Sequence, residues 1–246
     1  MKWIGYLFSF IWRIWFLLAF ILVFILFIPI LFLFTAIIKN NKIVNHLTKY
    51  WSRMFLILSG IFWKIEFEEK LNQRVQYIFC ANHASTLDIP LIAAAIPMPL
   101  LFMGKESLAK IPIFGYFYKK NSIIVNRSNI RNSYDAFLEA GEKIDQGLNV
   151  CIFPEGGIPK SSVFLRKFKN GPFKLSIEKD IYIVPISLAD NKMHFPQEYY
   201  KGFPGIVRIK VHKAIKSNLN NKNALKNLNT LVYNTIFDQL KSYESR

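Results

Sequence analysis

Hydrophobic residues are far more continuous in the first part of the chain than in the rest of it. Ile14 to Ile38 is a run of 25 residues without a charged side chain, and a helix needs about 20 apolar residues to cross the hydrocarbon core of a bilayer. Pro29 divides this run, so a kinked span and a re-entrant hairpin are both compatible with the pattern. A secretory signal peptide would have a shorter apolar region, followed by a small-residue cleavage site. The run therefore predicts a membrane-embedded helical segment.

The next stretch, residues 43–63 (IVNHLTKYWSRMFLILSGIFW), mixes apolar and basic residues at helical spacing. This pattern predicts a helix at the membrane interface, with a helix packed on the protein core as the alternative. Residues 1–64 contain seven lysines and arginines and no acidic residue, and five of the seven follow the apolar run. Under the positive-inside rule, this distribution puts the rest of the chain on the cytoplasmic side. We therefore expect residues 1–63 to anchor the protein at the cytoplasmic face of a membrane.

From residue 64 onward, short β-rich runs alternate with helical patterns. This alternation predicts one α/β domain over residues 64–246, with a central sheet flanked by helices. The sheet is expected to mix parallel and antiparallel strands, because some connections are too short for parallel crossovers. The predicted strands are residues 64–69, 75–81, 99–104, 122–126, 149–153, 182–188 and 205–211, and the predicted helices are residues 88–96, 129–146, 172–179 and 224–240.

The charge balance is strongly basic, with 32 Lys and Arg against 16 Asp and Glu and a formal net charge of +16. Such an excess favours an anionic partner, which could be nucleic acid, anionic lipid or a phosphorylated substrate, and general solubility is the alternative explanation. Because the N-terminus is apolar and the chain has no nucleic-acid-binding motif, we expect no nucleic-acid partner. Cys80 and Cys151 both lie in apolar, strand-like runs without a zinc-type Cys/His spacing, so we expect buried, reduced thiols and no metal site.

The candidate chemistry begins where one apolar run ends, in the stretch 79–90 (FCANHASTLDIP). His83 and Asp88 are five residues apart and would lie about 140° apart on a regular α-helix. In a loop that enters a helix, however, the chain can fold back so that the carboxylate holds one ring nitrogen and the other acts as a base. No G-x-S-x-G nucleophile motif is present, so the pair would deprotonate a hydroxyl of the substrate. The alternatives are an ordinary loop histidine and an aspartate that caps the helix.

Three later stretches combine cations with turns. Residues 103–129 contain one acidic residue, Glu106, and residues 151–160 (CIFPEGGIPK) form a strand that leads into a glycine-rich turn with Glu155 at its tip. Cations near backbone amides that glycine leaves accessible suit a phosphate group, whereas a solvated basic face is the alternative for any single lysine. Glu155 is expected to bond substrate hydroxyls or to orient an arginine. The cations are Lys105, Lys110, Lys119, Lys120 and Arg127 in the first stretch and Arg166, Lys167, Lys169 and Lys174 in residues 164–176.

These blocks, in this order, resemble the 1-acylglycerol-3-phosphate acyltransferases among the glycerolipid acyltransferases. The resemblance covers residues 65–211. It rests on an N-H-x-x-x-x-D block, a G-K-x-S-L…I-P-x-F-G block with a β-run that ends in arginine, an F-P-E-G block, an F-K-x-G-x-F block and a V-P-I strand. The matching residues are Asn82, His83 and Asp88; Gly104, Lys105, Ser107, Leu108, Ile111, Pro112, Phe114, Gly115 and Arg127; Phe153, Pro154, Glu155 and Gly156; Phe168, Lys169, Gly171 and Phe173; and Val184, Pro185 and Ile186.

The resemblance implies transfer of an acyl chain from acyl carrier protein or coenzyme A to the sn-2 hydroxyl of lysophosphatidate, which gives phosphatidate. It also implies that His83 is the general base, that Asp88 orients it, and that Arg127 and the turn at Glu155 and Gly156 hold the glycerol phosphate. We add Lys105 and Lys160 to the candidate phosphate-binding residues. No metal or bound cofactor is implied, because both acyl donors are co-substrates.

The chain departs from the family pattern at two places. The β-run ends in Asn126-Arg127 where the family commonly has Asp-Arg, and Gly157, Ile158, Pro159 and Lys160 follow F-P-E-G where the family commonly has Thr-Arg-Ser-Arg. Both changes concern the phosphate site and leave the His–Asp pair intact. Glycerol 3-phosphate or another lysolipid is the alternative acceptor, and a non-catalytic protein that binds anionic lipid is the alternative from another functional class.

Overall fold

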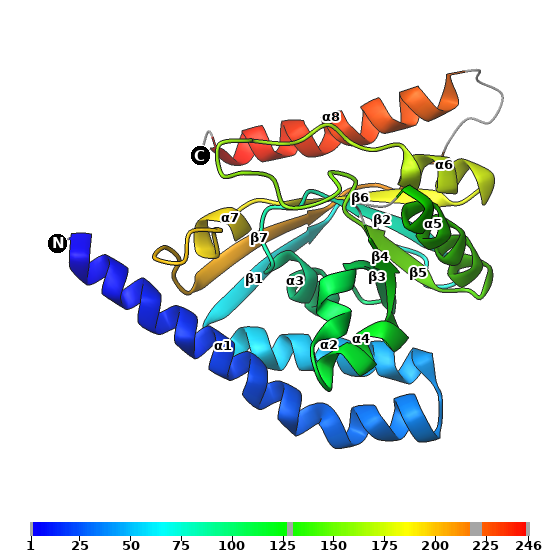
Figure 1. Cartoon of the computed structure of the whole chain (residues 1–246). Coiled ribbons are helices and arrows are strands. Elements are labelled where there is room, and N and C mark those ends of the chain that lie inside the picture. The colour runs from blue at the N-terminus through cyan, green and yellow to red at the C-terminus, as the bar shows by residue number, and fades with distance from the viewer. Residues whose placement is uncertain (1, 127–129, 217–222, 245–246) are drawn as a thin grey trace.

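A computed structural model describes residues 2–126, 130–216 and 223–244. A mixed β-sheet forms the middle layer, with helices on both faces (Figure 1). The helical segments are α1 (Lys2–Phe32), the π-helical η1 (Leu33–Ile37), α2 (Asn41–Leu58), α3 (Asp88–Ala95), the 3₁₀ segment η2 (Glu106–Lys110), α4 (Phe114–Asn121), α5 (Ile130–Asp145), α6 (Gly171–Glu178), α7 (Asn191–His194) and α8 (Ala224–Glu244). The predicted α/β class with a flanked central sheet is confirmed.

Seven strands of the described chain form one sheet in the order β1-β7-β6-β2-β5-β3-β4. Strands β6, β2, β5, β3 and β4 are mutually parallel, whereas β1 and β7 are parallel to each other and join β6 in the antiparallel sense. The predicted mixture of strand directions is therefore correct. The strands are β1 (Ile61–Phe67), β2 (Tyr77–Ala81), β3 (Leu100–Lys105), β4 (Ser122–Val125), β5 (Asn149–Ile152), β6 (Tyr182–Leu188) and β7 (Gly205–Val211).

Each face of the sheet buries its own hydrophobic cluster, because successive side chains of a strand point to opposite faces. In β2, Phe79 and Ala81 belong to the cluster that includes buried residues of α1, α2 and α3. Ile78 and Cys80 belong to the cluster formed with α5, α6 and α8. The domain is thus a three-layer arrangement, and α8 lies on the face opposite to α1 and α2 (Figure 1).

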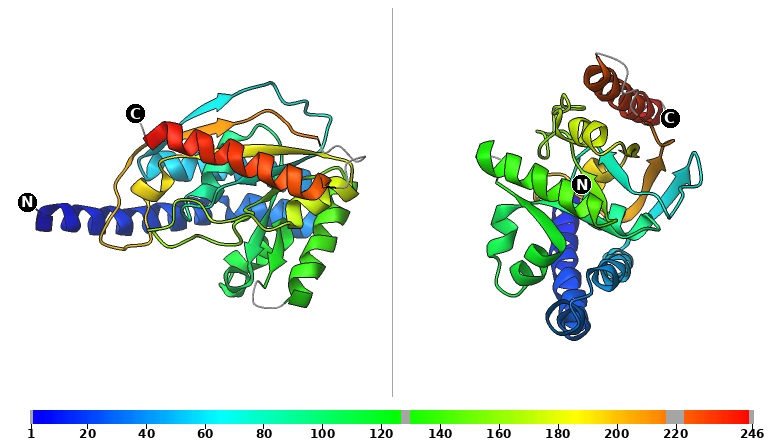
Figure 2. Two further views of the ribbon diagram at one scale, coloured as in Figure 1. Left: turned by 90° about the horizontal axis from the view of Figure 1, so that it is seen from above. Right: turned by 90° about the vertical axis from the view of Figure 1, so that its right-hand side faces the viewer.

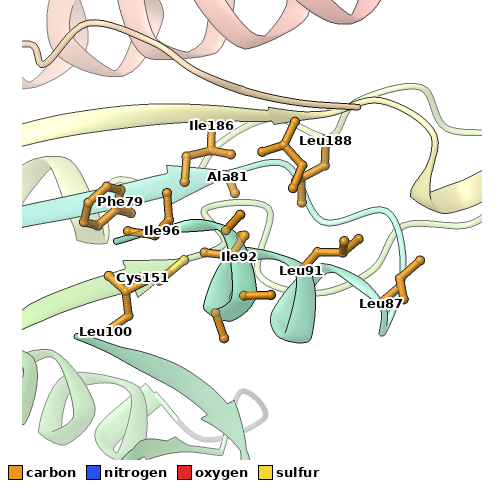
Figure 3. Close-up of a cluster of buried hydrophobic side chains, with 14 of the residues drawn as sticks. Phe79, Ala81, Leu87, Leu91, Ile92, Ile96, Leu100, Cys151, Ile186 and Leu188 are labelled. Carbon is orange, nitrogen blue, oxygen red and sulfur yellow. The ribbon is translucent and has the colours of Figure 1, made fainter. Parts of the chain in front are cut away.

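Helix α3 is fixed firmly under the middle of the sheet. Leu91 and Ile92 of α3 are fully buried in the same hydrophobic cluster as Phe79 and Ile186 (Figure 3). Truncating a buried leucine or isoleucine to alanine typically costs about 2–5 kcal/mol, so this packing holds the helix in one position. Because α3 starts at Asp88, the same packing fixes the first residue of the helix against the end of β2.

The transition from the N-terminal helices to the sheet lies earlier than the sequence pattern predicts. The helix expected through Trp63 ends at Leu58, and β1 begins at Ile61 rather than at residue 64. Gly60 makes the turn between them with φ +78°, a value that favours glycine, and an added Cβ would lie 2.9 Å from Pro204. The apolar letters after Gly60 are therefore the first residues of an edge strand, which helical spacing could not distinguish.

One face of α1 docks on the domain and the other is exposed. Trp12 is 6% exposed and donates from Nε1 to the Ser59 carbonyl at 2.9 Å, whereas Leu18 and Leu22 are more than half exposed. The helix continues through Pro29, and its N-terminal end extends past the domain (Figure 2). Within the described residues one helical stretch, Trp3–Ile37, is long and apolar enough to cross a membrane, and 17% of its most apolar window is buried.

Helix α2 packs on the protein core, which was the alternative to an interfacial helix. Phe55 and Leu56 are at most 1% exposed and belong to the same cluster as α3 and the sheet. Arg53 also donates from Nε to the Ala94 carbonyl of α3 at 2.9 Å. Helix α2 therefore connects the apolar α1 to the helix that begins with Asp88.

Candidate active site

The loops that carry the sequence motifs meet at one edge of the sheet. Because β2, β5 and β6 are parallel neighbours, their carboxyl ends lie side by side, and this edge is where ligands bind in open α/β sheets. The loop with His83 follows β2, the F-P-E-G turn follows β5, and α7 follows β6. The His83 loop therefore lies between the other two.

His83 and Asp88 form the predicted pair. His83 Nδ1 lies 2.7 Å from Asp88 Oδ2, and the side chains are 8% and 0% exposed. The carboxylate accepts the Nδ1 proton, so Nε2 carries the lone pair of the neutral ring. Within the described residues no group hydrogen-bonds to Nε2. His83 also stacks on Phe153 of the F-P-E-G turn, with ring centroids 4.0 Å apart, which fixes the plane of the imidazole.

Asp88 holds the loop that precedes its own helix. Its Oδ2 accepts the backbone N–H groups of Ala84 at 2.7 Å and Ser85 at 2.9 Å. The aspartate is the first residue of α3 rather than the residue before it, and it makes no capping bond to the helix. The alternative of an ordinary N-cap is therefore wrong, because the side chain folds back over the loop. This closed loop makes a contact that a continuous helix would not allow.

Asn191 is a second partner of Asp88 that sequence reasoning missed. Its Nδ2 donates to Asp88 Oδ1 at 2.6 Å, and the residue is fully buried. Asn191 begins the four-residue helix α7, after a two-residue connection from β6. The only signal in the sequence was the polar pair Asp190-Asn191, which follows the strand predicted over residues 182–188. Asp88 thus receives a hydrogen bond from a residue 103 positions away.

Asn82 ties the start of the loop to the end of β6. Its Nδ2 donates to the Leu188 carbonyl at 3.0 Å, and its Oδ1 accepts the Leu188 N–H at 2.8 Å. The side chain therefore continues the backbone pairing between β2 and β6 for one further residue. This reciprocal pair holds the chain at the point where it leaves the strand and presents His83.

Glu155 connects the F-P-E-G turn to the His83 loop. It is 1% exposed, and its two carboxylate oxygens accept the backbone N–H groups of His83 at 2.7 Å and Arg166 at 2.9 Å. Burial raises the pKa of the Glu155 carboxyl above its ordinary value, although both backbone donors act in the opposite direction. The guanidinium of Arg166 also donates to the backbone carbonyl of Glu155 at 3.5 Å, so Glu155 contacts an arginine through both its side chain and its backbone. We assign the residue a positioning role.

We expect Glu155→Gln to lower the free energy of unfolding by about 1–3 kcal/mol, because one new amide N–H would face a backbone N–H donor. Activity should fall with it, since the amide oxygen can accept only one of the two bonds that now hold the backbone of His83 and of Arg166. Denaturant unfolding of the purified chain would measure the first effect. Glu142→Gln, at an exposed position of α5, is the matched control and should stay within about 0.5 kcal/mol. Equal stability of the two variants would contradict the positioning role.

Gly156 makes the turn after Glu155 possible. Its φ is +76°, and an added Cβ would lie 2.7 Å from Lys169 Cε and 2.9 Å from Lys169 Nζ. Lys169 belongs to the F-K-x-G-x-F block, and its backbone N–H donates to the Pro154 carbonyl at 2.9 Å. The structure therefore places the Lys169 side chain against the glycine turn that the sequence predicts to bind phosphate.

Of the other candidate phosphate residues, Lys105 lies at the same edge of the sheet. Lys105 is the exposed last residue of β3 and pairs in register with Val125 of β4. Arg127, two positions after Val125, lies outside the described residues. Lys160 is exposed in the long segment after β5, where the neighbouring Pro159 carbonyl accepts a hydrogen bond from Gln197 at 3.0 Å. No contact of Lys105 or Lys160 with the His83 loop is described.

A cavity of about 610 Å³ adjoins this edge of the sheet. Lys192 and Met193 of α7 line it, next to Asn191 and hence to Asp88, and Ser161 lines it beside Lys160. The beginning of α1 contributes Gly5, Tyr6 and Ser9 to its wall. The cavity is therefore bounded by the apolar helix on one side and by the helix that contacts the His–Asp pair on the other.

The two cysteines are free and fully buried. Burial raises the pKa of both thiols above the ordinary range, so neither is a thiolate nucleophile at neutral pH. This agrees with a reaction in which the attacking group comes from the substrate.

The sequence matches a known protein family. The model of the family described as Acyltransferase matches residues 63–189, just over half of the chain. The chain is 29% identical over 184 residues to the 1-acyl-sn-glycerol-3-phosphate acyltransferase of Cocos nucifera, covering 74% of this chain and 58% of that protein. It is 26% identical over 188 residues to the enzyme of the same name from Saccharomyces cerevisiae, covering 75% and 62%. The one from Borreliella burgdorferi is 25% identical over 191 residues, covering 77% and 76%.

A solved structure shares the fold. The crystal structure of the 1-acyl-sn-glycerophosphate (LPA) acyltransferase from Thermotoga maritima superposes with a TM-score of 0.77 and 21% sequence identity, covering 100% of this chain and 99% of that one. The match includes the N-terminal helices as well as the sheet. The curated relatives from coconut and yeast are longer, and this chain spans 58% and 62% of their length.

Proposed function

The chain belongs to the acyltransferase family, and on that premise we propose that it transfers an acyl chain from an acyl thioester to the sn-2 hydroxyl of 1-acylglycerol 3-phosphate, giving phosphatidate. The observation that carries this proposal is the 2.7 Å bond between His83 Nδ1 and Asp88 Oδ2, which leaves Nε2 directed to no protein group in the described chain. The names of the relatives in three organisms support lysophosphatidate as the acceptor. Acyl carrier protein and coenzyme A are the candidate donors.

The chemistry needs one base that later acts as an acid. His83 Nε2 takes the proton of the sn-2 hydroxyl as its oxygen forms a bond to the thioester carbonyl carbon. The negative charge of Asp88 stabilises the imidazolium and keeps its Nδ1–H in place. When the tetrahedral intermediate collapses, the carbon–sulfur bond breaks and the imidazolium returns the proton to the leaving thiolate. The ester and the free thiol are the products, and the histidine is neutral again.

The phosphate of the acceptor needs cations at the same edge of the sheet. We propose that Lys105, Arg127 and the turn at Gly156 bind it, with Lys160 as a further contact. Lys169 lies against Gly156 and extends this set. Charge-assisted bonds from several cations would orient the glycerol so that its free hydroxyl meets Nε2. We further propose that the cavity beside α7 receives the lipid part of the substrates.

A direct test is an assay of the purified full chain with labelled acyl-acyl carrier protein or acyl-coenzyme A. Lysophosphatidate, glycerol 3-phosphate and lysophosphatidylcholine would be offered as acceptors in parallel. We expect labelled phosphatidate from lysophosphatidate, and at least tenfold less product from the other two acceptors. Preference for glycerol 3-phosphate or for lysophosphatidylcholine would assign a different acceptor. Absence of product with either donor would support a non-catalytic lipid-binding protein instead.

Lys160 stands where relatives commonly carry arginine, and its contribution can be measured. A charge-assisted hydrogen bond to phosphate is worth about 1.5–3 kcal/mol, which corresponds to roughly 10–150-fold. We expect Lys160→Ala to lower kcat/KM for lysophosphatidate by this factor and to leave the KM for the acyl donor unchanged. Lys160→Arg should be tolerated, since it keeps the charge. Lys167→Ala serves as the comparison with a neighbouring exposed cation; a loss there, with Lys160→Ala within twofold of wild type, would reassign the contact.

We also propose that the domain faces the cytoplasm from the membrane surface, as the basic residues after the apolar run predict. Because Cys80 and Cys151 are 0% exposed, a cysteine introduced at the exposed Lys226 of α8 would be the reactive thiol in the folded chain. We expect Lys226→Cys to be labelled by a membrane-impermeant maleimide in inverted vesicles and to be protected in intact cells. Labelling in intact cells would show that the domain lies on the opposite side of the membrane.

A further inference from the structure

A second group of cations surrounds a cavity at the opposite edge of the sheet. This cavity, of about 400 Å³, is lined by Leu101 and Ser122, which lie in the first two residues of β3 and β4. The His–Asp pair instead follows the last residue of β2, which runs in the same direction. Four lysines line the cavity, together with one acidic residue, Glu139. The lysines are Lys39, Lys119, Lys120 and Lys143.

The basic residues of the stretch 103–129 do not form one group in the structure. Lys105 and Lys119 lie in one basic stretch, but they are at opposite ends of the sheet, because η2 and α4 return the chain to the start of β4. Lysines in the last turns of α4 and α5 also offset the helix dipoles. That effect explains each lysine separately. It does not explain why four lysines line one cavity with a single carboxylate, Glu139, which offsets only one of the four charges. A further anion in the cavity would offset the rest.

The backbone around the cavity is also unusual. Thr35 lies in the π-helical segment η1, which interrupts the regular helix before α2, and such segments occur frequently at functional sites. The residue is 7% exposed and lines the cavity, and among the described residues its Oγ1 has no hydrogen-bond partner. Lys39 follows with φ 57°, a left-handed conformation that is uncommon for lysine. The corner between α1 and α2 is therefore shaped to bring Thr35 and Lys39 to this cavity.

Apolar side chains border the same corner. Leu33, Ile37 and Ile38 are 40%, 63% and 51% exposed, and they continue the exposed apolar face of α1. A soluble phosphate would make no use of them, whereas acyl chains would cover them. We propose that this cavity binds the phosphate group of an anionic membrane phospholipid, with the lysines on the headgroup and the exposed residues of η1 against the acyl chains.

The proposal assigns a lipid site that is separate from the site of acyl transfer and does not depend on it. A lipid bound there would hold the edge of the sheet where β3 and β4 begin at the bilayer surface, next to the C-terminal end of α1. The carboxyl edge, with the His–Asp pair, would then keep a fixed orientation relative to the membrane. Attraction to an anionic lipid surface is worth about fivefold in affinity for each lysine close to it.

The experiment measures lipid binding without either substrate. The purified full chain in neutral detergent is titrated with phosphatidylglycerol or phosphatidylcholine, and native mass spectrometry counts the lipids retained on the protein. We expect one phosphatidylglycerol to be retained at least tenfold more tightly than phosphatidylcholine. The double variant Lys119→Gln/Lys120→Gln should raise its apparent Kd about 30-fold, and Lys39→Gln about fivefold.

The matched control is Lys226→Gln/Lys241→Gln, which removes the same charge from α8 on the far face of the sheet. Its Kd should stay within threefold of wild type. Equal weakening by both double variants would overturn the proposal in favour of general electrostatic attraction. Wild-type protein that does not prefer phosphatidylglycerol would overturn it outright. Displacement of the lipid by inorganic phosphate at the same concentration would also overturn it, because the ligand would then be a soluble phosphate.

Discussion

His83→Ala is expected to lower kcat by at least ~100-fold, the lower range for loss of a general base, while the protein stays folded. The structure explains why the fold should survive. Asp88 keeps the backbone N–H groups of Ala84 and Ser85 and the amide of Asn191 as donors when the imidazole is removed. Steady-state acyl transfer to lysophosphatidate, together with thermal unfolding of the purified chain, measures both parts of this expectation.

The matched control for this variant is His46→Ala, which removes an exposed imidazole from α2. It should leave kcat and stability at the wild-type level. Activity of His83→Ala above a tenth of wild type would exclude His83 as the base. A large loss in the His46 variant would mean instead that the assay responds to general damage or to membrane attachment.

Asp88→Asn is the second variant with a large expected effect. An amide cannot stabilise the imidazolium by its charge, and amidation of the carboxylate behind a catalytic histidine lowers kcat by about 10⁴ in a Ser-His-Asp triad. We expect a loss of about 10²–10⁴ in kcat. The structure also predicts that the variant folds. If the side chain of Asn191 turns over, its Oδ1, which has no partner in the described chain, can accept a hydrogen bond from the new amide.

Asp88→Ala separates the catalytic role from the structural one. It removes the acceptor of two backbone N–H groups and of Asn191 Nδ2, and each unsatisfied buried donor costs about 1–3 kcal/mol. We expect this variant to lose several kcal/mol of stability as well as activity, whereas Asp88→Asn should lose about 1 kcal/mol or less. Denaturant unfolding and kcat, measured on both variants, test this difference. If Asp88→Asn keeps more than a tenth of wild-type activity, the carboxylate serves only to hold the loop.

The parts of the site that the sequence predicted are those in which the interacting residues are close in the chain. His83 and Asp88 are five positions apart, and a short loop that enters a helix confines the possible geometries strongly enough for the contact to be inferred. The strands could also be predicted from the sequence, because each is a short run of β-forming residues that alternates with a helical pattern of apolar residues. The prediction failed at Ile61, where a strand follows a helix after a two-residue turn and apolar letters fit either period.

The parts that could not be predicted join residues far apart in the chain. Glu155 bonds the backbone of His83 across 72 positions, and Asn191 reaches Asp88 across 103. Helix α7, which presents Asn191, has four residues and is too short to show helical periodicity. The basic stretch that contains Lys105 and Lys119 reads as a single phosphate-binding block, because sequence alone does not say at which edge of the sheet each lysine lies.

The sequence by itself determined the apolar N-terminal helix, the α/β class with its mixed sheet, and the identity of the His–Asp pair, since all three depend on composition, on period or on contacts within one loop. Tertiary structure alone decided what surrounds that pair. The order of the parallel strands sets the F-P-E-G turn on one side of His83 and α7 on the other, so Glu155 holds the backbone of the loop and Asn191 holds its carboxylate. The same strand directions place Lys119 and Lys120 at the opposite edge, because these residues end α4 just before the chain enters the first residue of β4.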